Sequence, residues 1–166
     1  MAATDGLRIR AAVRAVVLDP DDRVMLVRFE FPTATVWALP GGGIEPGECD
    51  HDALRRELGE ELGLVDVEIG PHVWTRLHIV PFLDGSHDGQ RDHVYLVRTD
   101  AFEPHPQLTW EQLTAERVHE LRWWWPADLR DDDLLAGAFL APRRLPDLLD
   151  DLITHGPPAE PVDTGV

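Results

Sequence analysis

The hydrophobic positions near the start of the chain follow the pattern of strands. Residues 8–18 are rich in Val and Ala and alternate imperfectly with polar positions, and residues 24–29 form a second apolar run. A Pro-Asp-Asp turn sequence separates the two runs, which predicts a β-hairpin. A third, short apolar run at residues 37–39 is stopped by a proline and three glycines.

Residues 50–62 have a helical pattern instead, because leucines recur at every fourth position and share one face. Asp50 stands where an N-cap is expected and Gly63 stands where a glycine commonly ends a helix. A last helix is predicted over residues 147–155, with Pro146 in its first turn.

The remaining apolar runs predict strands at residues 65–69, 73–80, 94–99 and 121–125, with a loop at residues 84–92. Strands and helices interleave without the regular spacing of a doubly wound sheet. We therefore expect an α/β protein in which helices pack on a mixed sheet.

The domain organisation follows from the same pattern. Residues 7–155 are expected to form a single domain, preceded by a flexible N-terminus at residues 1–6. Residues 156–166 contain three prolines and no apolar periodicity, so we expect a disordered C-terminal tail.

Composition narrows the class of protein. The 166 residues carry 15 Lys and Arg against 31 Asp and Glu, a formal net charge of −16, which argues against a nucleic-acid binder that needs a basic face. No apolar run is long enough for a membrane helix, and the first residues lack a signal-peptide pattern, so the expected location is the cytoplasm. The single cysteine, Cys49, excludes an intrachain disulfide or a cysteine-based zinc cluster. Because the chain is strongly acidic, an anionic substrate would have to be attracted by something other than the net charge of the protein, such as a bound cation.

Three glutamates gather on one face of the first predicted helix. Glu57, Glu60 and Glu61 stand at positions i, i+3 and i+4. Like charges at this spacing destabilise a helix by about 0.2–0.5 kcal/mol per pair. Carboxylate oxygens are suitable ligands for Mg²⁺ or Mn²⁺, so a cation would relieve the repulsion. The alternative interpretation is a solvated acidic face.

A glycine-rich loop precedes this helix. Gly41–Gly43 and Gly47 allow tight turns and a close approach of the backbone to a ligand. Glu48 lies eight residues before Arg56, and we interpret the two as a structural ion pair that holds the loop to the helix.

Residues 42–64 resemble the signature box of the Nudix hydrolases, G-x5-E-x7-R-E-U-x-E-E-x-G-U, in which U is a bulky aliphatic residue. The chain matches this pattern at every defined position. The matching residues are Gly42, Glu48, Arg56, Glu57, Leu58, Glu60, Glu61, Gly63 and Leu64. A complete match over so many single-identity positions is a specific signal. Outside this box, the order of the predicted elements is compatible with the family but much less specific.

The resemblance implies a Nudix-type α/β/α sandwich with a mixed β-sheet. It also implies hydrolysis of the pyrophosphate linkage of a nucleoside diphosphate joined to another group, with Mg²⁺ or Mn²⁺ as cofactor. By position, Glu57, Glu60 and Glu61 are the implied metal ligands, together with the backbone carbonyl of Gly41. The cation would activate a water for attack on phosphorus. A homodimer is compatible with the resemblance, because many relatives are dimers.

The base that takes the proton of the water varies within the family. We expect Glu60 to take it, and we expect both Glu60 and Glu61 to be needed for turnover. Glu111, Glu116 and Glu120 are candidates for a carboxylate contributed by a later loop.

Three further residues are candidates for substrate contacts. Arg28 and Arg76 could each bind phosphate oxygens, since a guanidinium offers a fork of donors, and each could instead be an ordinary surface arginine. Trp37, near the glycine loop, could stack on a nucleobase or pack in the core. The same choice applies to the tryptophans at residues 123–125, of which the first and third share one face of a strand.

The rival interpretation is a catalytically silent Nudix fold that binds a nucleotide as a sensor or partner module. The complete set of glutamates argues against it, because a binding module has no need of so repulsive a face. The substrate stays open among oxidised nucleoside triphosphates, dinucleoside polyphosphates, nucleotide sugars and ADP-ribose.

Overall fold

The computed structural model describes residues 4–166 of the chain. Its elements, in chain order, are β1 (Ile9–Leu18), β2 (Val24–Phe31), β3 (Ala34–Ala38), β4 (Gly41–Gly43), α1 (Asp50–Leu62), β5 (His72–His78), β6 (Gly89–Arg98), α2 (Trp110–Ala115), β7 (Val118–Trp124), the 3-10 helix η1 (Pro126–Arg130), α3 (Asp132–Leu135), β8 (Phe139–Ala141), α4 (Leu145–His155) and β9 (Val162–Asp163).

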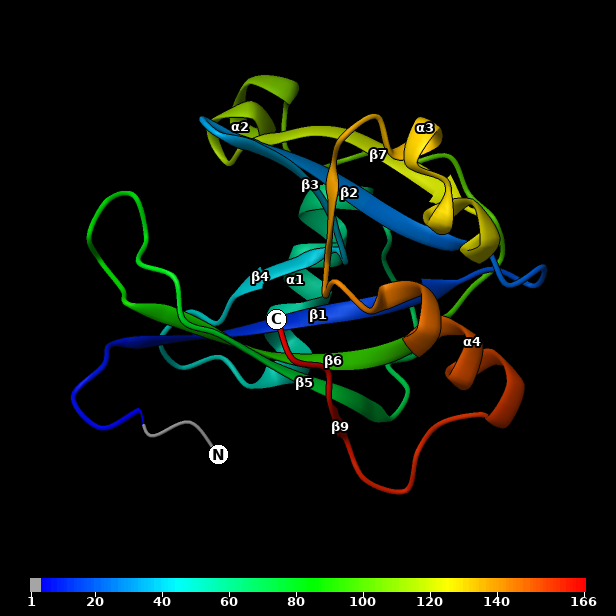
Figure 1. Cartoon of the computed structure of the whole chain (residues 1–166), viewed down its shortest axis with the longest axis horizontal. Coiled ribbons are helices and arrows are strands. Elements are labelled where there is room, and N and C mark those ends of the chain that lie inside the picture. The colour runs from blue at the N-terminus through cyan, green and yellow to red at the C-terminus, as the bar shows by residue number, and fades with distance from the viewer. Residues whose placement is uncertain (1–3) are drawn as a thin grey trace.

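Strand β1 runs through the middle of the molecule (Figure 1). It pairs in parallel with β6 over its whole length and in antiparallel orientation with β4 at Ala12–Arg14. It pairs with β2 only beside their shared turn, where Leu18 lies opposite Val24. Beyond that turn β2 pairs with β3 and β7 instead. The mixed sheet therefore opens between β1 and β2, and the glycine loop enters at this opening.

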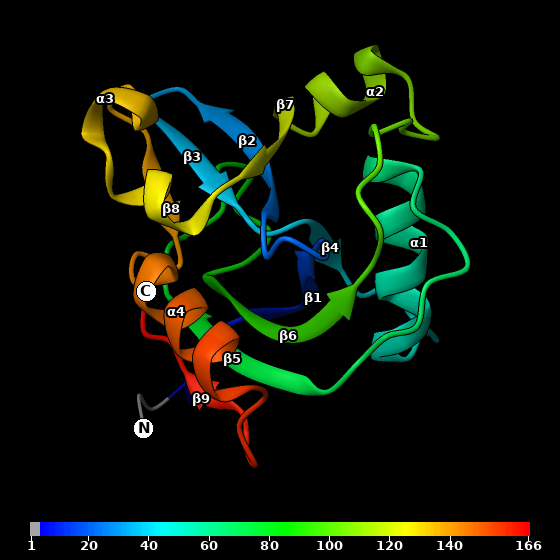
Figure 2. The ribbon, with the colours of Figure 1, turned by 90° about the vertical axis from the view of Figure 1, so that its right-hand side faces the viewer.

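Helices cover both faces of the sheet. Val13, Ala15 and Val17 of β1 belong to the buried cluster that includes the leucines of α1. Val16 and Leu18 face the other way, into the cluster that includes the leucines of α4. Figure 2 shows α1 and α4 on opposite sides of the strands. This arrangement confirms the expected α/β/α class with a mixed sheet, and it follows from side chains that alternate between the two faces of one strand.

Helix α1 begins and ends at the residues predicted for it, Asp50 and Leu62, and Gly63 ends it in the left-handed conformation with φ of 68°. The predicted N-cap is wrong. Cys49 is the N-cap, and the carboxylate of Asp50 is turned away to accept hydrogen bonds from His93 and Tyr95 on β6. The side chain of Asp50 therefore binds residues of β6 and does not cap its own helix.

Several predicted segments differ from the structure, and two of them differ most. Residues 65–69 form no strand, because they connect α1 to β5 and no neighbouring strand is paired with them. Strand β6 begins at Gly89, inside the predicted loop at residues 84–92, because Ile9 on β1 already pairs with Gly89. Strand ends are set here by the partner strand rather than by the apolar run.

The C-terminal tail is ordered, which corrects the prediction of disorder for residues 156–166. Val162 and Asp163 form β9 and pair in parallel with Trp74 and Thr75 on β5. Thr164 is buried, and its N–H donates to the carbonyl of Thr75 at 3.0 Å. The tail is held by backbone pairing at a sheet edge, which needs no apolar periodicity in the tail itself.

At the other end of the chain, residues 1–3 of the predicted flexible N-terminus, residues 1–6, lie outside the described residues. Among residues 4–166, no helix combines the length and the apolar character that crossing a membrane requires.

Candidate active site

The three glutamates of α1 line one hollow of about 670 Å³ at the opening between β1 and β2. Glu57 and Glu61 are buried, with 8% and 2% of their surface exposed. The leucines of α1 pack on the sheet, and this packing turns the glutamate face of the helix toward the hollow. Four arginines line the same hollow, which are Arg10, Arg14, Arg56 and Arg117. Arginines and carboxylates therefore lie together in this hollow.

Two glycines let the loop lie against its neighbours. Gly41 has φ of 139°, and a Cβ on it would overlap the carbonyl oxygen of Val13. A Cβ on Gly42 would lie 2.5 Å from the carboxylate of Glu57. Glycine is therefore required where the loop is in contact with both β1 and the glutamate face.

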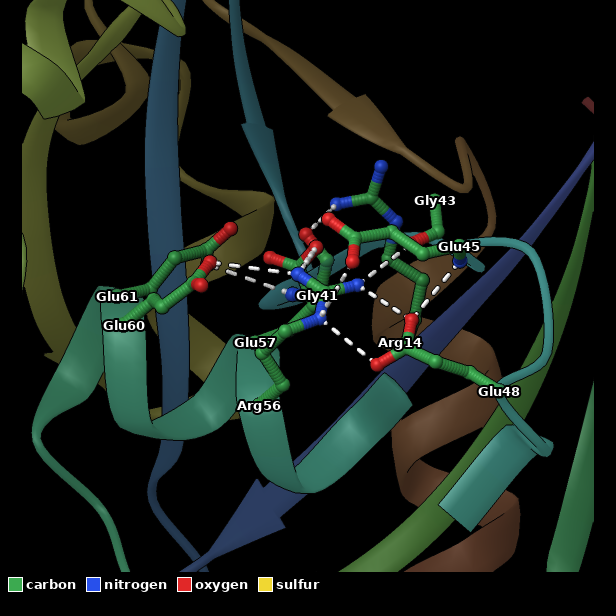
Figure 3. Close-up of polar contacts among 9 residues, drawn as sticks. All are labelled: Arg14, Gly41, Gly43, Glu45, Glu48, Arg56, Glu57, Glu60 and Glu61. Carbon is green, nitrogen blue, oxygen red and sulfur yellow. Dashed lines mark hydrogen bonds and ion pairs between the residues drawn. The ribbon is translucent and has the colours of Figure 1, made fainter. Parts of the chain in front are cut away.

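Arg56 joins the loop to the helix. Its Nε and Nη2 each donate to Glu48 at 2.9 Å, and Nη2 also donates to the carbonyl of Gly43 at 3.0 Å (Figure 3). The hydrogen bonds from Arg56 lower the pKa of Glu48 to about 2. This bidentate pair is the one expected from the spacing of the two residues, and it fixes the loop beside the glutamates.

Burial disfavours the charged form of two box glutamates, although arginines lie nearby. Burial raises the pKa of Glu61 to about 8, and it also raises the pKa of Glu57. Glu116, an exposed residue that lines the same hollow, has its pKa raised by partial desolvation and by the charge of Glu60. Carboxylates with raised pKa values in one hollow are typical of a functional site.

The donor set fits a hard divalent cation. Glu57 and Glu60 contact Arg56 at 2.9 and 3.4 Å, and the only hydrogen bond that Glu61 accepts among the described residues comes from the N–H of Gly41 at 3.3 Å. Within residues 4–166, no three acidic, histidine or cysteine side chains converge on one point as ligands. The buried carboxylate of Glu61 nevertheless has free acceptor positions, and carboxylate and carbonyl oxygens are the ligands that Mg²⁺ prefers.

Of the three later carboxylates, only Glu116 lines this hollow. It follows α2, whose first turn is a capping box between Thr109 and Gln112. Glu111 is exposed in that first turn, and Glu120 lies on β7 beside a second, smaller hollow. The T-x-x-Q pattern of the capping box is a sequence signal that could have located this helix.

The predicted substrate contacts are divided between two other places. Arg28 and Trp37 line the second hollow, of about 170 Å³, where Nε of Arg28 lies 3.1 Å from Glu120. Trp37 is only 3% exposed and packs edge-on against Trp124. Arg76 lines neither hollow, and its guanidinium lies 3.5 Å from the buried carboxylate of Asp92.

The tryptophans at residues 123–125 differ in burial, and the last of them lies just beyond the end of β7. Trp124 is buried with Trp37, whereas Trp125 is about half exposed. The indole N–H of Trp123 donates to the carbonyl of Phe102 at 2.9 Å. These contacts are those of packing residues.

The sequence reasoning missed Arg10 and Arg14. Both stand at even positions of β1, the face on which Ala12, Val16 and Leu18 are buried. Arginines at inward positions of a buried strand were the available signal, because a buried charge needs a partner or a function.

Comparison with known proteins agrees with this geometry. The family model for the NUDIX domain matches residues 8–145. The chain belongs to the Nudix family. The box that carries the glutamates lies inside the matched residues, and the family is one of hydrolases.

Relatives of this Nudix chain include the nucleoside triphosphatase NudI of Escherichia fergusonii, which is 37% identical over 102 residues, 59% of this chain and 67% of that protein. Among solved structures, a C. elegans Ap4A hydrolase complex has a TM-score of 0.62 and 16% identity over 88% of this chain and 98% of that one. The NUDIX domain of Shewanella oneidensis NrtR, solved with ADP ribose, has a TM-score of 0.59 and 19% identity over 93% and 92% of the two chains. These two structures support the fold alone.

Proposed function

We propose that the chain is a metal-dependent hydrolase of the pyrophosphate linkage in a nucleoside diphosphate joined to another group. The observation that carries this proposal is the hollow in which Glu57, Glu60 and Glu61 face the arginines of β1 and of the box. Carboxylates suit a divalent cation, and arginines suit phosphate oxygens. A nucleoside triphosphate is the first substrate to test, because the similar NudI protein is named a nucleoside triphosphatase.

Mg²⁺ or Mn²⁺, held by the three glutamates and the carbonyl of Gly41, would neutralise phosphate charge and lower the pKa of the attacking water. Arg10 and Arg117 line the same hollow and bind the non-bridging oxygens of the substrate. The water oxygen forms a bond to phosphorus while the bridging P–O bond breaks, and the bridging oxygen leaves with the other phosphate.

Glu60 accepts the proton of that water in this proposal. It is the least buried of the three box glutamates, so a water molecule can reach it. Glu116 is the alternative base, because it lies in the same hollow and close enough to Glu60 for the two charges to interact. The second hollow would receive the part of the substrate beyond the phosphates, with Arg28 as the contact, because Trp37 is buried against Trp124.

The test is product release from a panel of nucleoside triphosphates, nucleotide sugars, dinucleoside polyphosphates and ADP-ribose, with Mg²⁺ or Mn²⁺. Glu60→Gln should lower kcat by about 10²–10⁴-fold, the contribution typical of a general base. Glu68→Gln is the matched control, because Glu68 is exposed on the loop after α1 and outside the hollow. Glu116→Gln separates the two candidate bases.

Near wild-type turnover in both Glu60→Gln and Glu61→Gln would refute the role given to the glutamate face. A chain that cleaves nothing in the panel, yet binds nucleotides, would instead support the silent sensor module.

A further inference from the structure

One arginine holds the backbone at the point where the chain enters the glycine loop. Nη1 of Arg14 donates to the carbonyls of Leu39 at 3.2 Å and of Gly41 at 3.0 Å. The carbonyl between them, that of Pro40, accepts from the N–H of Ala15 at 2.9 Å. Two adjacent residues of β1 thus fix three successive peptide carbonyls, and the orientation of the Gly41 carbonyl depends on the guanidinium.

The same glycine connects Arg14 to the glutamate face. The N–H of Gly41 donates to Oε2 of Glu61 at 3.3 Å, while its carbonyl accepts from Arg14 (Figure 3). Arg14 also faces the buried glutamates, and its charge lowers the pKa of Glu61 against the larger effect of burial. A shift of this guanidinium would therefore move both the carbonyl and the carboxylate.

Arg14 is also in contact with a buried carboxylate, that of Asp92 on β6. Its Nε lies 3.7 Å from Asp92, a carboxylate that is only 4% exposed. Asp92 in turn accepts a hydrogen bond from Gln90 at 2.7 Å and lies 3.5 Å from Arg76. Buried charges of this kind are strongly destabilising unless they are paired, so the chain of contacts restricts Arg14 to one place.

We propose that Arg14 is a positioning residue, which aims the carbonyl of Gly41 and the carboxylate of Glu61 at the divalent cation, and that Asp92 and Arg76 hold Arg14 in place. This inference rests on the proposed function, because that function requires the cation. It gives Arg76 a supporting role on β5, consistent with its absence from the lining of both hollows.

Binding of Mn²⁺ to the purified full chain, followed by the electron paramagnetic resonance signal of free Mn²⁺, measures this role without turnover. Arg14→Met should raise the Kd for Mn²⁺ about 10–100-fold, the range seen when a group that orients a metal ligand is removed. Arg14→Lys should recover at least part of the affinity, since an ammonium can also donate to the two carbonyls. Arg98→Met is the control, because Arg98 is exposed at the end of β6 and outside the hollow, and it should leave the Kd for Mn²⁺ unchanged.

A second variant, at Asp92, tests the contact that holds Arg14 in place. Asp92→Asn keeps Arg14 but removes the charge behind it, and it should weaken Mn²⁺ binding by a smaller factor than Arg14→Met. For both Arg14→Met and Asp92→Asn, hydrolysis measured at saturating Mn²⁺ should show a lower kcat. The KM for the nucleotide should not change, because the substrate contacts remain.

Each other outcome overturns the inference in a recognisable way. Wild-type affinity for Mn²⁺ in Arg14→Met, with the wild type binding Mn²⁺ well, refutes the positioning role and leaves the proposed function intact. A raised KM with an unchanged Kd for Mn²⁺ makes Arg14 a phosphate contact instead. A lowered melting temperature with unchanged Mn²⁺ affinity in both Arg14→Met and Asp92→Asn would show that Arg14 has a structural role only. A wild type that binds no Mn²⁺ refutes the proposed function together with this inference.

Discussion

Replacing Glu61 by glutamine should change how the stability of the metal-free chain depends on pH. Glu61 is 2% exposed, and burial raises its pKa to about 8 from an ordinary value of 4.5. Glutamine has the same shape, stays neutral at every pH and keeps an oxygen for the N–H of Gly41. The substitution therefore removes the titration of this side chain and retains most of its packing.

The sign follows from the two pKa values. Between pH 4.5 and about 8 the folded chain holds a proton on Glu61 that the unfolded chain has released. Unfolding releases that proton, so this carboxyl makes the free energy of unfolding fall as the pH rises. One proton corresponds to about 1.4 kcal/mol per pH unit, or at most about 4 kcal/mol from pH 5 to pH 8. That amount is a large fraction of a typical stability of about 5–15 kcal/mol.

The assay is urea unfolding in the presence of EDTA at pH 5, 6, 7 and 8, followed by the fluorescence of the six tryptophans. Glu61→Gln should match the wild type at pH 5 and be more stable than it at pH 8. Glu68→Gln, an exposed control, should follow the wild type throughout. Parallel curves for Glu61→Gln and the wild type would show that Glu61 is not protonated in the metal-free fold, and the electrostatic account of the hollow would fail.

Two further predictions test the glycine loop and the C-terminal strand. Gly41→Ala should destabilise the chain by more than about 2 kcal/mol in thermal denaturation, because the residue has φ of 139° and its Cβ would overlap the carbonyl oxygen of Val13. Gly137→Ala has φ of 82° but open space around the Cβ, so an equal loss there would contradict the packing argument. Truncation after residue 160 should remove β9, accelerate hydrogen exchange at the edge strand β5 and leave hydrolysis intact, since no residue of β9 lines the hollow. Unchanged exchange at β5 would mean that β9 does not protect that edge in solution.

Local sequence was enough to predict the helix that carries the glutamates. Asp50 to Leu62 has a clear period of leucines, and a glycine follows it, so both ends and both faces could be predicted without knowledge of the rest of the chain. The pairing of Glu48 with Arg56 is similarly local, because the two residues are only eight positions apart in the sequence.

Contacts between segments that are distant in the sequence were much harder to predict from the sequence alone. The choice of Glu116 over Glu111 and Glu120 depends on where α2 ends relative to the hollow. The burial of Trp37 depends on Trp124, 87 positions further along the chain. The order of the C-terminal tail depends on a free edge of β5. None of these partners can be identified from the periodicity of a single segment.

The sequence by itself thus determined the class of the fold, the family and the glutamate face. Both the helical periodicity and the complete motif can be recognised within one short, continuous segment. Only the tertiary structure decided that Arg10 and Arg14 of β1 enter the same hollow and that Arg14 holds the carbonyl of Gly41. The physical reason is the register of pairing between β1 and β4. That register places Arg14 opposite Gly41, and it depends on the partner strand and on the close approach that glycine allows, neither of which can be identified from one segment alone.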